Sequence, residues 1–435
     1  AVAAARAGAR TMLVEREGVL GGVATAGLMA NIGNLFLDRQ GRPVIGGIAR
    51  EVIDRMVARG AASAHWASRE VPGVVIDSEQ LKIVLIEMLQ EAGVTVLTHT
   101  LAARPLVREA AVEGAFIETK KGRQAIRAQV VVDATGEADL AYGAGCAMRW
   151  SGGSASLEFK MGRVDLDALY RHFQRHPETF PAGMDFVRGF SEFERNWVER
   201  GIFFFPHGGG SRWDIVQRAI ERGDLPKAQG ILWGLDATGL YGLRQADTVI
   251  VNSNFWQVDT LDPLRLSAAE LETQKACYVV ADFLRRCVPG FERAYIVQMA
   301  TALGIRTSRG IEGAATLTGE QVSSAQPMRS AEAIGRSPCR ARFAETGEFV
   351  YPHTFDIPYG VLVPQGVENL LVGSGKSVSC VPQHLIRGMA GCMVVGQAAG
   401  AAAALAARHA VPPRRLDVPG LQRVLLEQGV DLGPH

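Results

Sequence analysis

The stretch Val130-Val131-Val132-Asp133-Ala134-Thr135-Gly136 decides the fold of this chain. Its three consecutive valines predict a buried parallel strand, and the Thr-Gly pair predicts a turn where that strand ends. A similar strand that ends in glycines is expected at 369–375, followed by a helix of small residues over 388–407. Directly before the valines, a small antiparallel meander is expected from strands near 104–109, 112–119 and 124–129. These elements indicate an α/β fold.

The N-terminal residues are the second informative segment. An Ala-rich helix that ends near Gly8 precedes the short strand Thr11-Met12-Leu13-Val14, which is followed by Glu15. This order is the second half of a βαβ dinucleotide-binding unit, whose acid accepts hydrogen bonds from a ribose about 20 residues after a glycine fingerprint. The fingerprint would lie upstream of Ala1, so we expect an N-terminal truncation that removes one strand and its phosphate loop. The alternative is an ordinary αβ unit.

The middle of the chain differs in character from both ends. It contains the aromatic run 203–205, several tryptophans and a long helical stretch at 268–287. We therefore expect an inserted α+β substrate or cap domain over 151–350, and one exposed helix in the tail 411–435. The other predicted elements are amphipathic helices at 46–59 and 77–92 and a strand at 94–99.

Composition excludes several classes of protein. The 435 residues are 47% hydrophobic and 21% charged, which suits two or three domains with a large core. The 46 basic and 45 acidic residues show no basic stripe, so nucleic-acid binding is not expected. Six widely spaced cysteines predict reduced thiols. The longest apolar run, 393–407, is too short to span a membrane, and no signal-peptide pattern is seen, so a cytoplasmic protein is expected.

Five sets of motifs, in consistent order, resemble the FAD-dependent oxidoreductase family built on the glutathione-reductase-type Rossmann fold. They are Val14-Glu15-Arg16 with Gly21-Gly22-Val23-Ala24-Thr25, Asp133-Ala134-Thr135-Gly136-Glu137-Ala138-Asp139-Leu140, Gly304-Ile305-Arg306-Thr307-Ser308-Arg309-Gly310-Ile311 with Thr316-Leu317-Thr318-Gly319-Glu320, Asp356-Ile357-Pro358-Tyr359-Gly360 with Val367-Glu368-Asn369-Leu370-Leu371-Val372, and Gly396-Gln397-Ala398-Ala399-Gly400. The resemblance implies a Rossmann-like FAD-binding domain, with a parallel sheet and an antiparallel meander, over 1–150 and 351–410. It implies FAD as the cofactor.

The resemblance also implies which residues contact FAD. Glu15, with Arg16 beside it, would hold the adenosine ribose. The pyrophosphate and ribityl region would be lined by Gly21, Gly22 and Thr25, and a second contact loop would be formed by Thr135, Gly136 and Asp139. The chain would pass beside the flavin at Gly373 and Gly375, and the helix start from Gly388 to Cys392 would face the pyrimidine edge. A positive helix end there would stabilise the negative charge of reduced flavin.

Three residues are candidates for catalysis. Arg387, just before the Gly388 helix, would add positive charge at the flavin, and His384 would accept a proton on the substrate side, since imidazole titrates near neutral pH. His207, among Phe and Gly residues, is the second proton carrier to consider, and a mobile apolar lid is its alternative. His353 is expected to be structural, although it could face a substrate. The chain departs from the family at Gly375-Lys376-Ser377 and around Cys380.

Two other chemistries are weighed and set aside. His172 and His176 have the spacing of a zinc pair, but no acid or cysteine completes the set, so no metal site is expected. Cys380 and Cys392 flank the proposed flavin loop, yet their spacing differs from Cys-x-x-Cys, and inert packing is the favoured interpretation.

These observations predict an FAD-dependent oxidoreductase that transfers a hydride from a small or medium organic substrate to flavin. One alternative in the same class is a dehydrogenase that desaturates a C–C bond. A different class is a non-catalytic remnant or partner-binding scaffold without flavin. A small molecule is the expected partner, and a homo-oligomer is left open.

Overall fold

Two separate pairs of parallel strands form the centre of the computed structural model, which describes residues 1–33, 36–38, 40–67, 73–181, 189–205, 213–226, 232–235, 239–252, 254–324, 329–339, 341–342, 349–350 and 353–433. Strand β1 (Met12–Val14) pairs with β4 (Thr95–Leu97), and β8 (Val131–Asp133) pairs with β23 (Leu370–Val372). The strands predicted at 94–99, 130–132 and 369–375 are therefore confirmed. In the described residues the two pairs are not joined into one sheet.

The burial expected for the valine strand is only partly found. Val131 and Val132 are half-buried, and Met12 in β1 is 45% exposed, although parallel strands are usually covered on both faces. The reason is a large cavity, because residues of β1 and residues 130–132 line it.

The predicted antiparallel meander is confirmed. Strands β5 (Leu101–Arg108), β6 (Ala111–Thr119) and β7 (Gly122–Arg127) form a three-stranded sheet in chain order. The first strand starts three residues earlier than expected. With the parallel pairs, the meander confirms the α/β class with parallel and antiparallel sheets.

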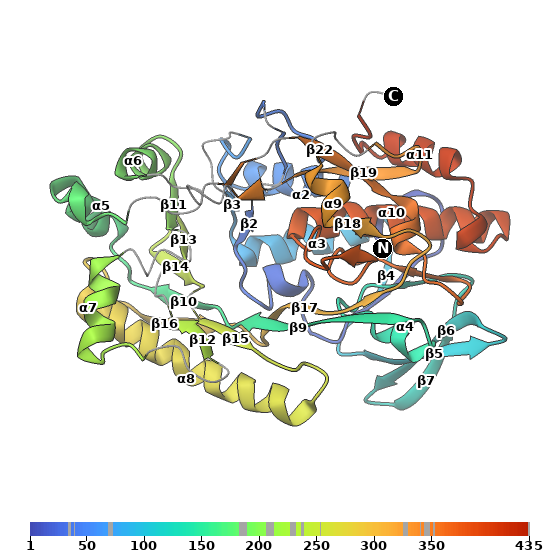
Figure 1. The fold of residues 1–435 in the computed structure, drawn as a ribbon, viewed down its shortest axis with the longest axis horizontal. Coiled ribbons are helices and arrows are strands. Elements are labelled where there is room, and N and C mark those ends of the chain that lie inside the picture. The colour runs from blue at the N-terminus through green and yellow to red at the C-terminus, as the bar shows by residue number, and fades with distance from the viewer. Residues whose placement is uncertain are drawn as a thin grey trace.

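Helix α10 (Met389–His409) runs through the core beside the parallel strands, as the small residues at 388–407 predict (Figure 1). It packs against α1 (Val2–Arg6), α2 (Gly47–Ala58) and α11 (Val418–Glu427). Helices α1 and α10 are close at Gly400, where an added Cβ would lie 3.2 Å from both Ala3 Cβ and Ala4 N. Small residues thus allow α1 to approach α10 closely.

By length and composition α10 would also suit a membrane span, and it is the one such helix in the described residues. However, 78% of its most apolar window is buried inside the fold, as in the core helix of many proteins.

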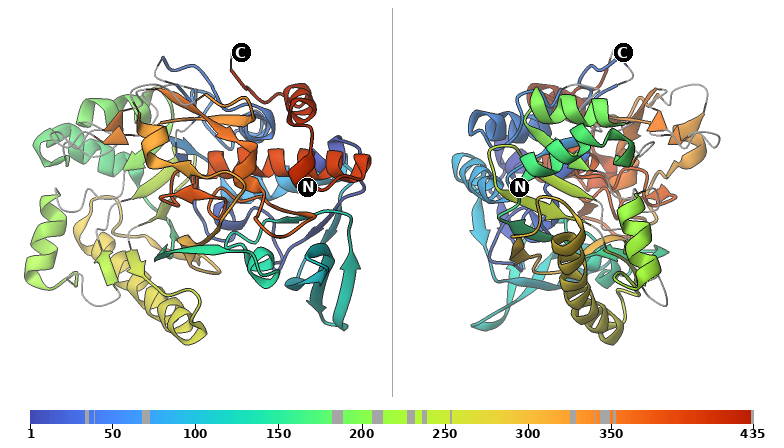
Figure 2. Two further views of the ribbon diagram at one scale, coloured as in Figure 1. Left: turned by 45° about the vertical axis from the view of Figure 1, so that its right-hand side comes forward. Right: turned by 90° about the vertical axis from the view of Figure 1, so that its left-hand side faces the viewer.

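Strands and helices from 148–311 form the other end of the molecule, with α5–α8 on its outside (Figures 1 and 2). A five-stranded sheet has the order β11 (Ile202–Phe205), β13 (Leu240–Leu243), β14 (Thr248–Val251), β10 (Phe159–Gly162) and β16 (Tyr295–Met299). A four-stranded sheet has the order β12 (Leu232–Leu235), β15 (Asn254–Gln257), β9 (Met148–Ser156) and β17 (Gly304–Ile311). The helices are α5 (Leu166–Arg175), α6 (Phe190–Val198), α7 (Asp214–Arg222) and α8 (Pro263–Cys287).

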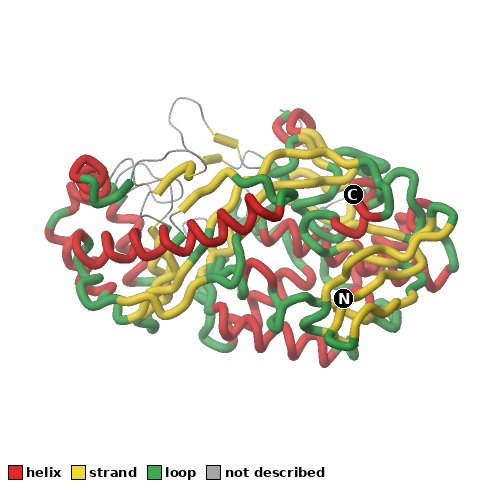
Figure 3. Tube along the Cα trace, turned by 90° about the horizontal axis from the view of Figure 1, so that it is seen from below, coloured by secondary structure: helices red, strands yellow, loops and turns green. Residues whose placement is uncertain are grey.

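Helix α8 corresponds to the helix expected at 268–287, but it starts earlier. Pro263 stands at its first position, and the Asp262 side chain caps the N–H groups of Leu264 and Arg265. The helix lies on the outside of the molecule, on the side seen in Figure 3.

The tail contains one α-helix, as expected, but one face of that helix is buried and not exposed. A 3-10 turn at Pro413–Arg415 leads into α11, in which Leu421 and Leu425 are fully buried and α10 is the neighbouring helix. Apolar residues four apart share one face of a helix, and this face covers the core.

Strand β19 (Ala333–Pro338) pairs with β22 (Thr354–Pro358). This pairing crosses position 350, where the expected substrate or cap domain ends in the sequence.

The remaining elements are short, apart from α3 (Ser78–Glu91), which together with α2 agrees with the two predicted amphipathic helices. They are β2 (Asn31–Gly33), β3 (Gly73–Val75), α4 (Asp139–Gly143), β18 (Leu317–Thr318), α9 (Gly319–Ser323), β20 (Ala341–Arg342), β21 (Phe349–Val350), β24 (Cys380–Val381), and 3-10 turns at Gly22–Ala24, Pro177–Thr179 and Tyr359–Leu362.

Candidate functional site

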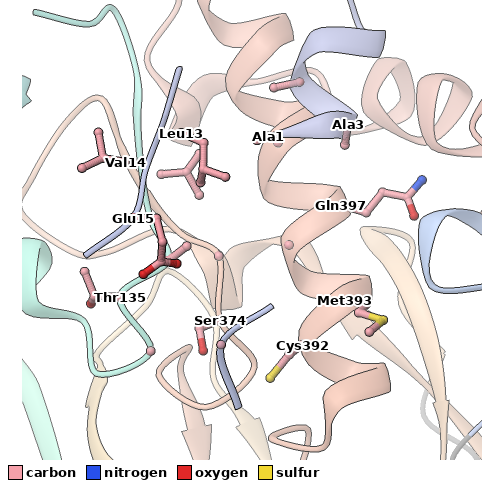
Figure 4. A pocket seen from close by; sticks show the side chains of 18 of the residues that line it. Ala1, Ala3, Leu13, Val14, Glu15, Thr135, Ser374, Cys392, Met393 and Gln397 are labelled. Atoms are coloured by element: carbon pink, nitrogen blue, oxygen red, sulfur yellow. The ribbon is translucent and has the colours of Figure 1, made fainter. Parts of the chain in front are cut away.

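One large cavity, of about 2720 Å³, lies between the two parallel pairs and extends to the strands of the other end of the molecule. Sites for small molecules usually measure about 300–1,000 Å³, so this cavity has room for a large cofactor and a second molecule. Figure 4 shows Glu15, Thr135, Ser374 and Cys392 around the same space, with α10 as one wall.

Glu15 lies on the cavity wall directly after β1. Its backbone N–H donates to the Leu97 carbonyl at 2.8 Å, which continues the pairing with β4 and fixes where the side chain leaves the strand. Its Oε1 accepts from the Glu17 N–H at 2.9 Å. Arg16 also lines the cavity, and its Nε donates to Glu17 at 3.1 Å.

The glycine pair after β1 is open to the cavity. Gly21 has φ 106°, and an added Cβ would lie 2.7 Å from the Thr25 side chain, so only glycine fits. Gly22 has φ 53°, and an added Cβ would meet no atom within 4 Å. A large group can therefore approach the backbone of Gly22.

Thr25 is not on the cavity wall, which differs from its expected contact with FAD. The residue is fully buried, and its hydroxyl donates to the Leu20 carbonyl at 2.5 Å. The side chain holds the glycine turn from inside, because the short 3-10 turn at Gly22–Ala24 directs it toward the protein.

Asp133 organises the turn that follows β8. This buried carboxylate accepts from the Thr135 N–H and hydroxyl and from the Ala141 N–H at 2.7–3.0 Å. The Thr135 hydroxyl in turn accepts from the Asp139 N–H at 3.0 Å. Thr135, Gly136 and Asp139 all line the cavity, so the structure brings the predicted contact loop to it.

Asp139 has a protein partner. Arg309 forms an ion pair with its carboxylate, donates to the Glu137 carbonyl at 3.2 Å and lies 4.5 Å from the centre of the Tyr142 ring. Burial raises the pKa of Asp139, and the Arg309 cation opposes that shift. The contact gives Arg309 a structural role that the sequence did not reveal.

The glycines after β23 differ in their positions. Gly373 lines the cavity, and an added Cβ would lie 2.7 Å from Val132 Cγ1. Gly375 is not on the cavity wall and instead allows close packing, since its added Cβ would lie 2.3 Å from the Ile386 carbonyl oxygen. Lys376, the next residue, does line the cavity. Its ammonium group donates to the Ile305 carbonyl at 3.0 Å, and burial lowers its pKa.

The N-terminus of α10 opens onto the same cavity. His384, Arg387, Gly388 and Cys392, which belong to the segment expected to face the flavin, all line the cavity. Burial and the neighbouring Arg387 cation lower the pKa of His384, which is therefore neutral at pH 7. The Cys392 thiol donates to the Arg387 carbonyl at 3.3 Å, and burial raises its pKa, so the unreactive thiol form is favoured.

The other candidate histidines have different surroundings. His207 lies outside the described residues. His353 is not on the cavity wall, and its Nε2 is 2.6 Å from the Val322 carbonyl oxygen, as suits a structural residue. The rings of His172 and His176 are 5.3 Å apart, and His172 Nε2 hydrogen-bonds with the Thr179 hydroxyl at 3.3 Å. The described part of the chain contains no group of three potential metal ligands.

Cys380 is buried within β24, and burial raises the pKa of its thiol to about 12. Such a thiol does not ionise near neutral pH. Cys380 does not line the cavity.

Sequence reasoning missed a polar group at the other end of the cavity. Ser156, Glu158, Asn252 and Arg306 line it there, and the first three are at most 4% exposed. Burial raises the pKa of Glu158 to about 8, and Arg306 opposes the shift. No signal of this burial was present in the sequence, since polar Ser156, Glu158 and Lys160 alternate with apolar residues as on the solvent-facing side of a strand.

A sequence profile for the family described as FAD dependent oxidoreductase matches residues 1–425. The chain belongs to the FAD-dependent oxidoreductase family. No curated protein matches the sequence of this oxidoreductase significantly.

Solved structures similar to this oxidoreductase have low sequence identity. One is a geranylgeranyl bacteriochlorophyll reductase-like protein from Thermoplasma acidophilum, with 13% identity over 99% of this chain and 80% of that chain and a TM-score of 0.44. Another is p-nitrophenol 4-monooxygenase from Pseudomonas putida, with 8% identity over 98% of this chain and 76% of that chain and a TM-score of 0.41. A third is aklavinone-11 hydroxylase in complex with FAD and aklavinone, with 13% identity over 94% and 60% of the two chains and a TM-score of 0.38.

Proposed function

We propose that this FAD-dependent oxidoreductase binds FAD in the large cavity and oxidises a small or medium organic substrate there. The observation that carries the proposal is the convergence of Glu15, the 133–139 turn and the N-terminus of α10 on one space. These three parts come from distant points of the sequence, and each suits a different portion of a dinucleotide.

The residues around the cavity fit FAD in charge and in shape. Glu15 has the carboxylate that hydrogen-bonds ribose hydroxyls in dinucleotide-binding units. Gly22 leaves open space beside its backbone, where the cofactor would pass. The first N–H groups of α10, together with Arg387, place positive charge at the cavity. When bound, the flavin would supply the two-electron acceptor of the reaction.

The residues of this chain would orient the substrate and handle its proton. His384 is neutral at pH 7 because burial and Arg387 lower its pKa, so its imidazole can accept a proton. Arg387 would stabilise negative charge that develops beside it. The wall around these two residues would keep the reacting groups away from bulk water.

The test is to purify the chain, add FAD and remove free cofactor by gel filtration. We expect about one FAD per chain in the flavin absorbance bands, and tenfold or greater loss of affinity in Gly22→Val, whose side chain would enter the open space and strain φ. An exposed control is Gly60→Ala, which also has positive φ but lies away from the cavity. Failure of the wild-type chain to retain FAD at micromolar concentrations would contradict the proposal.

A further inference from the structure

A buried carboxyl group, that of Glu158, lies on the cavity wall at the end away from the proposed cofactor site. Glu158 is 4% exposed, lines the cavity, and has an Oε2 atom with no hydrogen-bond partner. Its neighbours in sequence, Leu157 and Phe159, are fully buried apolar residues. A carboxyl group in such surroundings is costly unless something pairs with it.

Glu158 and Asn252 lie at one end of the same strand pair. Phe159 pairs with Val251 and Lys160 with Ile250 in antiparallel β10 and β14, so Glu158, just before β10, and Asn252, just after β14, leave the pair at the same end. Ala300 holds the other side of Glu158, because its N–H donates to the Glu158 carbonyl at 2.9 Å.

Asn252 has the same unmet requirement. The residue is 1% exposed, lines the cavity, and its Oδ1 has no partner, while its Nδ2 reaches only the Met29 sulfur at 3.7 Å. Two buried side chains at the same end of this strand pair therefore present unpaired oxygens to the cavity. Buried polar atoms normally have partners, so a bound molecule is the simplest source of the missing hydrogen bonds.

We propose that Glu158 and Asn252 form the polar subsite of the substrate and receive a hydroxyl group, so that the oxidoreductase takes substrates that carry an alcohol group. This inference rests on the proposed function, in which the same cavity also holds the cofactor.

A hydroxyl group satisfies both side chains at once. It donates one hydrogen bond, which Asn252 Oδ1 can accept, and it accepts hydrogen bonds. Because burial raises the pKa of Glu158 to about 8, its carboxyl group is mostly protonated at pH 7 and can donate to the hydroxyl oxygen. A carbonyl group could accept from Glu158 but would leave Asn252 Oδ1 unpaired.

Ser156 at the end of β9 and Arg306 in β17 also line the cavity with this subsite. The guanidinium donates to the Ser156 hydroxyl at 3.1 Å, and Ser156 is opposite Gly304 in the β9–β17 pair. The cation is thus held at the wall, where it favours the ionised form of Glu158 and limits the rise of its pKa. Arg306 is a positioning residue in this arrangement.

The experiment compares cyclohexanol with cyclohexanone, two rings of similar shape that differ in the donor. Binding to the FAD-loaded chain is measured without oxygen as the concentration that gives half of the maximal shift in melting temperature. We expect the wild-type chain to prefer the alcohol by about tenfold or more, because a site built for a hydroxyl rejects an analogue without the donor. Equal affinity for the two rings would overturn the subsite without any variant.

Variants identify the residues. Asn252→Leu should reduce the preference to within about twofold, because the acceptor for the hydroxyl proton is lost. Glu158→Leu should weaken the binding of both rings, since both accept from the carboxyl group, whereas Glu158→Gln should keep most of that affinity, because an amide still donates. Glu272→Gln, an exposed change on α8, is the control. Full preference in Asn252→Leu, or unchanged affinity for both rings in Glu158→Leu, would show that the hydroxyl binds elsewhere and contradict the proposal. A leucine variant that does not fold leaves the wild-type comparison and the other variant decisive.

The same samples separate the two proposals. Bound FAD without alcohol preference would remove the subsite and leave the proposed function intact. Alcohol preference in a chain that retains no FAD would remove the proposed function while the subsite stands. Absence of both would overturn both.

Discussion

Replacing Glu158 by glutamine should change how the stability of the protein depends on pH. Burial raises the pKa of Glu158 in the folded chain from 4.5 to about 8, with Arg306 as the charged group that opposes the shift. Glutamine has nearly the same shape but does not titrate. The comparison therefore isolates the ionisation of one buried carboxyl group.

The number of protons bound in the folded and unfolded chains determines whether stability rises or falls with pH. Between pH 4.5 and about 8 the unfolded chain has lost this proton and the folded chain still holds it. The folded state thus binds more protons, and the contribution of Glu158 to stability, complete below pH 4.5, is lost as pH rises to about 8. A pKa that rises from 4.5 to about 8 corresponds to about 5 kcal/mol, since one pKa unit is about 1.36 kcal/mol.

The assay is urea unfolding of both proteins, without ligand, at one-unit steps from pH 5 to pH 9. The free energy of unfolding of Glu158→Gln minus that of the wild type should rise by about 1.4 kcal/mol per pH unit and level off above pH 8. The exposed change Glu272→Gln should produce no such slope. A difference that stays constant from pH 5 to pH 9 would refute the assignment of Glu158 as a buried, mostly protonated acid.

Three further predictions concern the cofactor side of the cavity. Glu15→Ala should weaken FAD binding at least tenfold with the fold kept, because each charge-assisted hydrogen bond to ribose is worth about 1.5–3 kcal/mol; unchanged flavin retention after dialysis would count against its placement. Arg387→Met should lower the flavin reduction potential by tens of millivolts in a dye-linked measurement, where about 30 mV corresponds to 1.4 kcal/mol. His384→Ala should leave that potential unchanged but slow flavin reduction by about 100-fold in anaerobic stopped flow. Thr25→Val should lower the free energy of unfolding in urea by about 1–3 kcal/mol, because the buried Leu20 carbonyl loses its donor, but it should change FAD affinity by less than threefold. A loss of FAD affinity without a loss of stability would show that Thr25 belongs to the cofactor site.

Features that depend on neighbouring residues could be predicted from the sequence. The strand at 130–132 is specified by consecutive valines, and the meander by alternating strands with a turn at 120–123. The glycines at 21 and 22 have positive φ, and that requirement is why glycine stands there. Residues tied to such local features, including Glu15 and Thr135, line the cavity as expected.

Features that depend on distant strands could not be predicted. Glu158 and Asn252 come to the same end of a strand pair only through the register of β10 and β14, which are far apart in the sequence. Thr25 and Gly375 belong to the expected segments, but the direction of a side chain within a turn depends on packing against Leu20 and Ile386. Motif matching locates a segment and does not say which of its residues face the ligand.

The separation of the two parallel pairs has a consequence for handling the protein. In the described part of the chain, β1 and β8 each pair on one side only, and both contribute apolar residues to the cavity wall. Unpaired backbone N–H and C=O groups on such an edge are a template for another strand, which is a common route to aggregation. Recombinant material should therefore self-associate as its concentration rises, and an added segment that pairs with these edges should suppress that association.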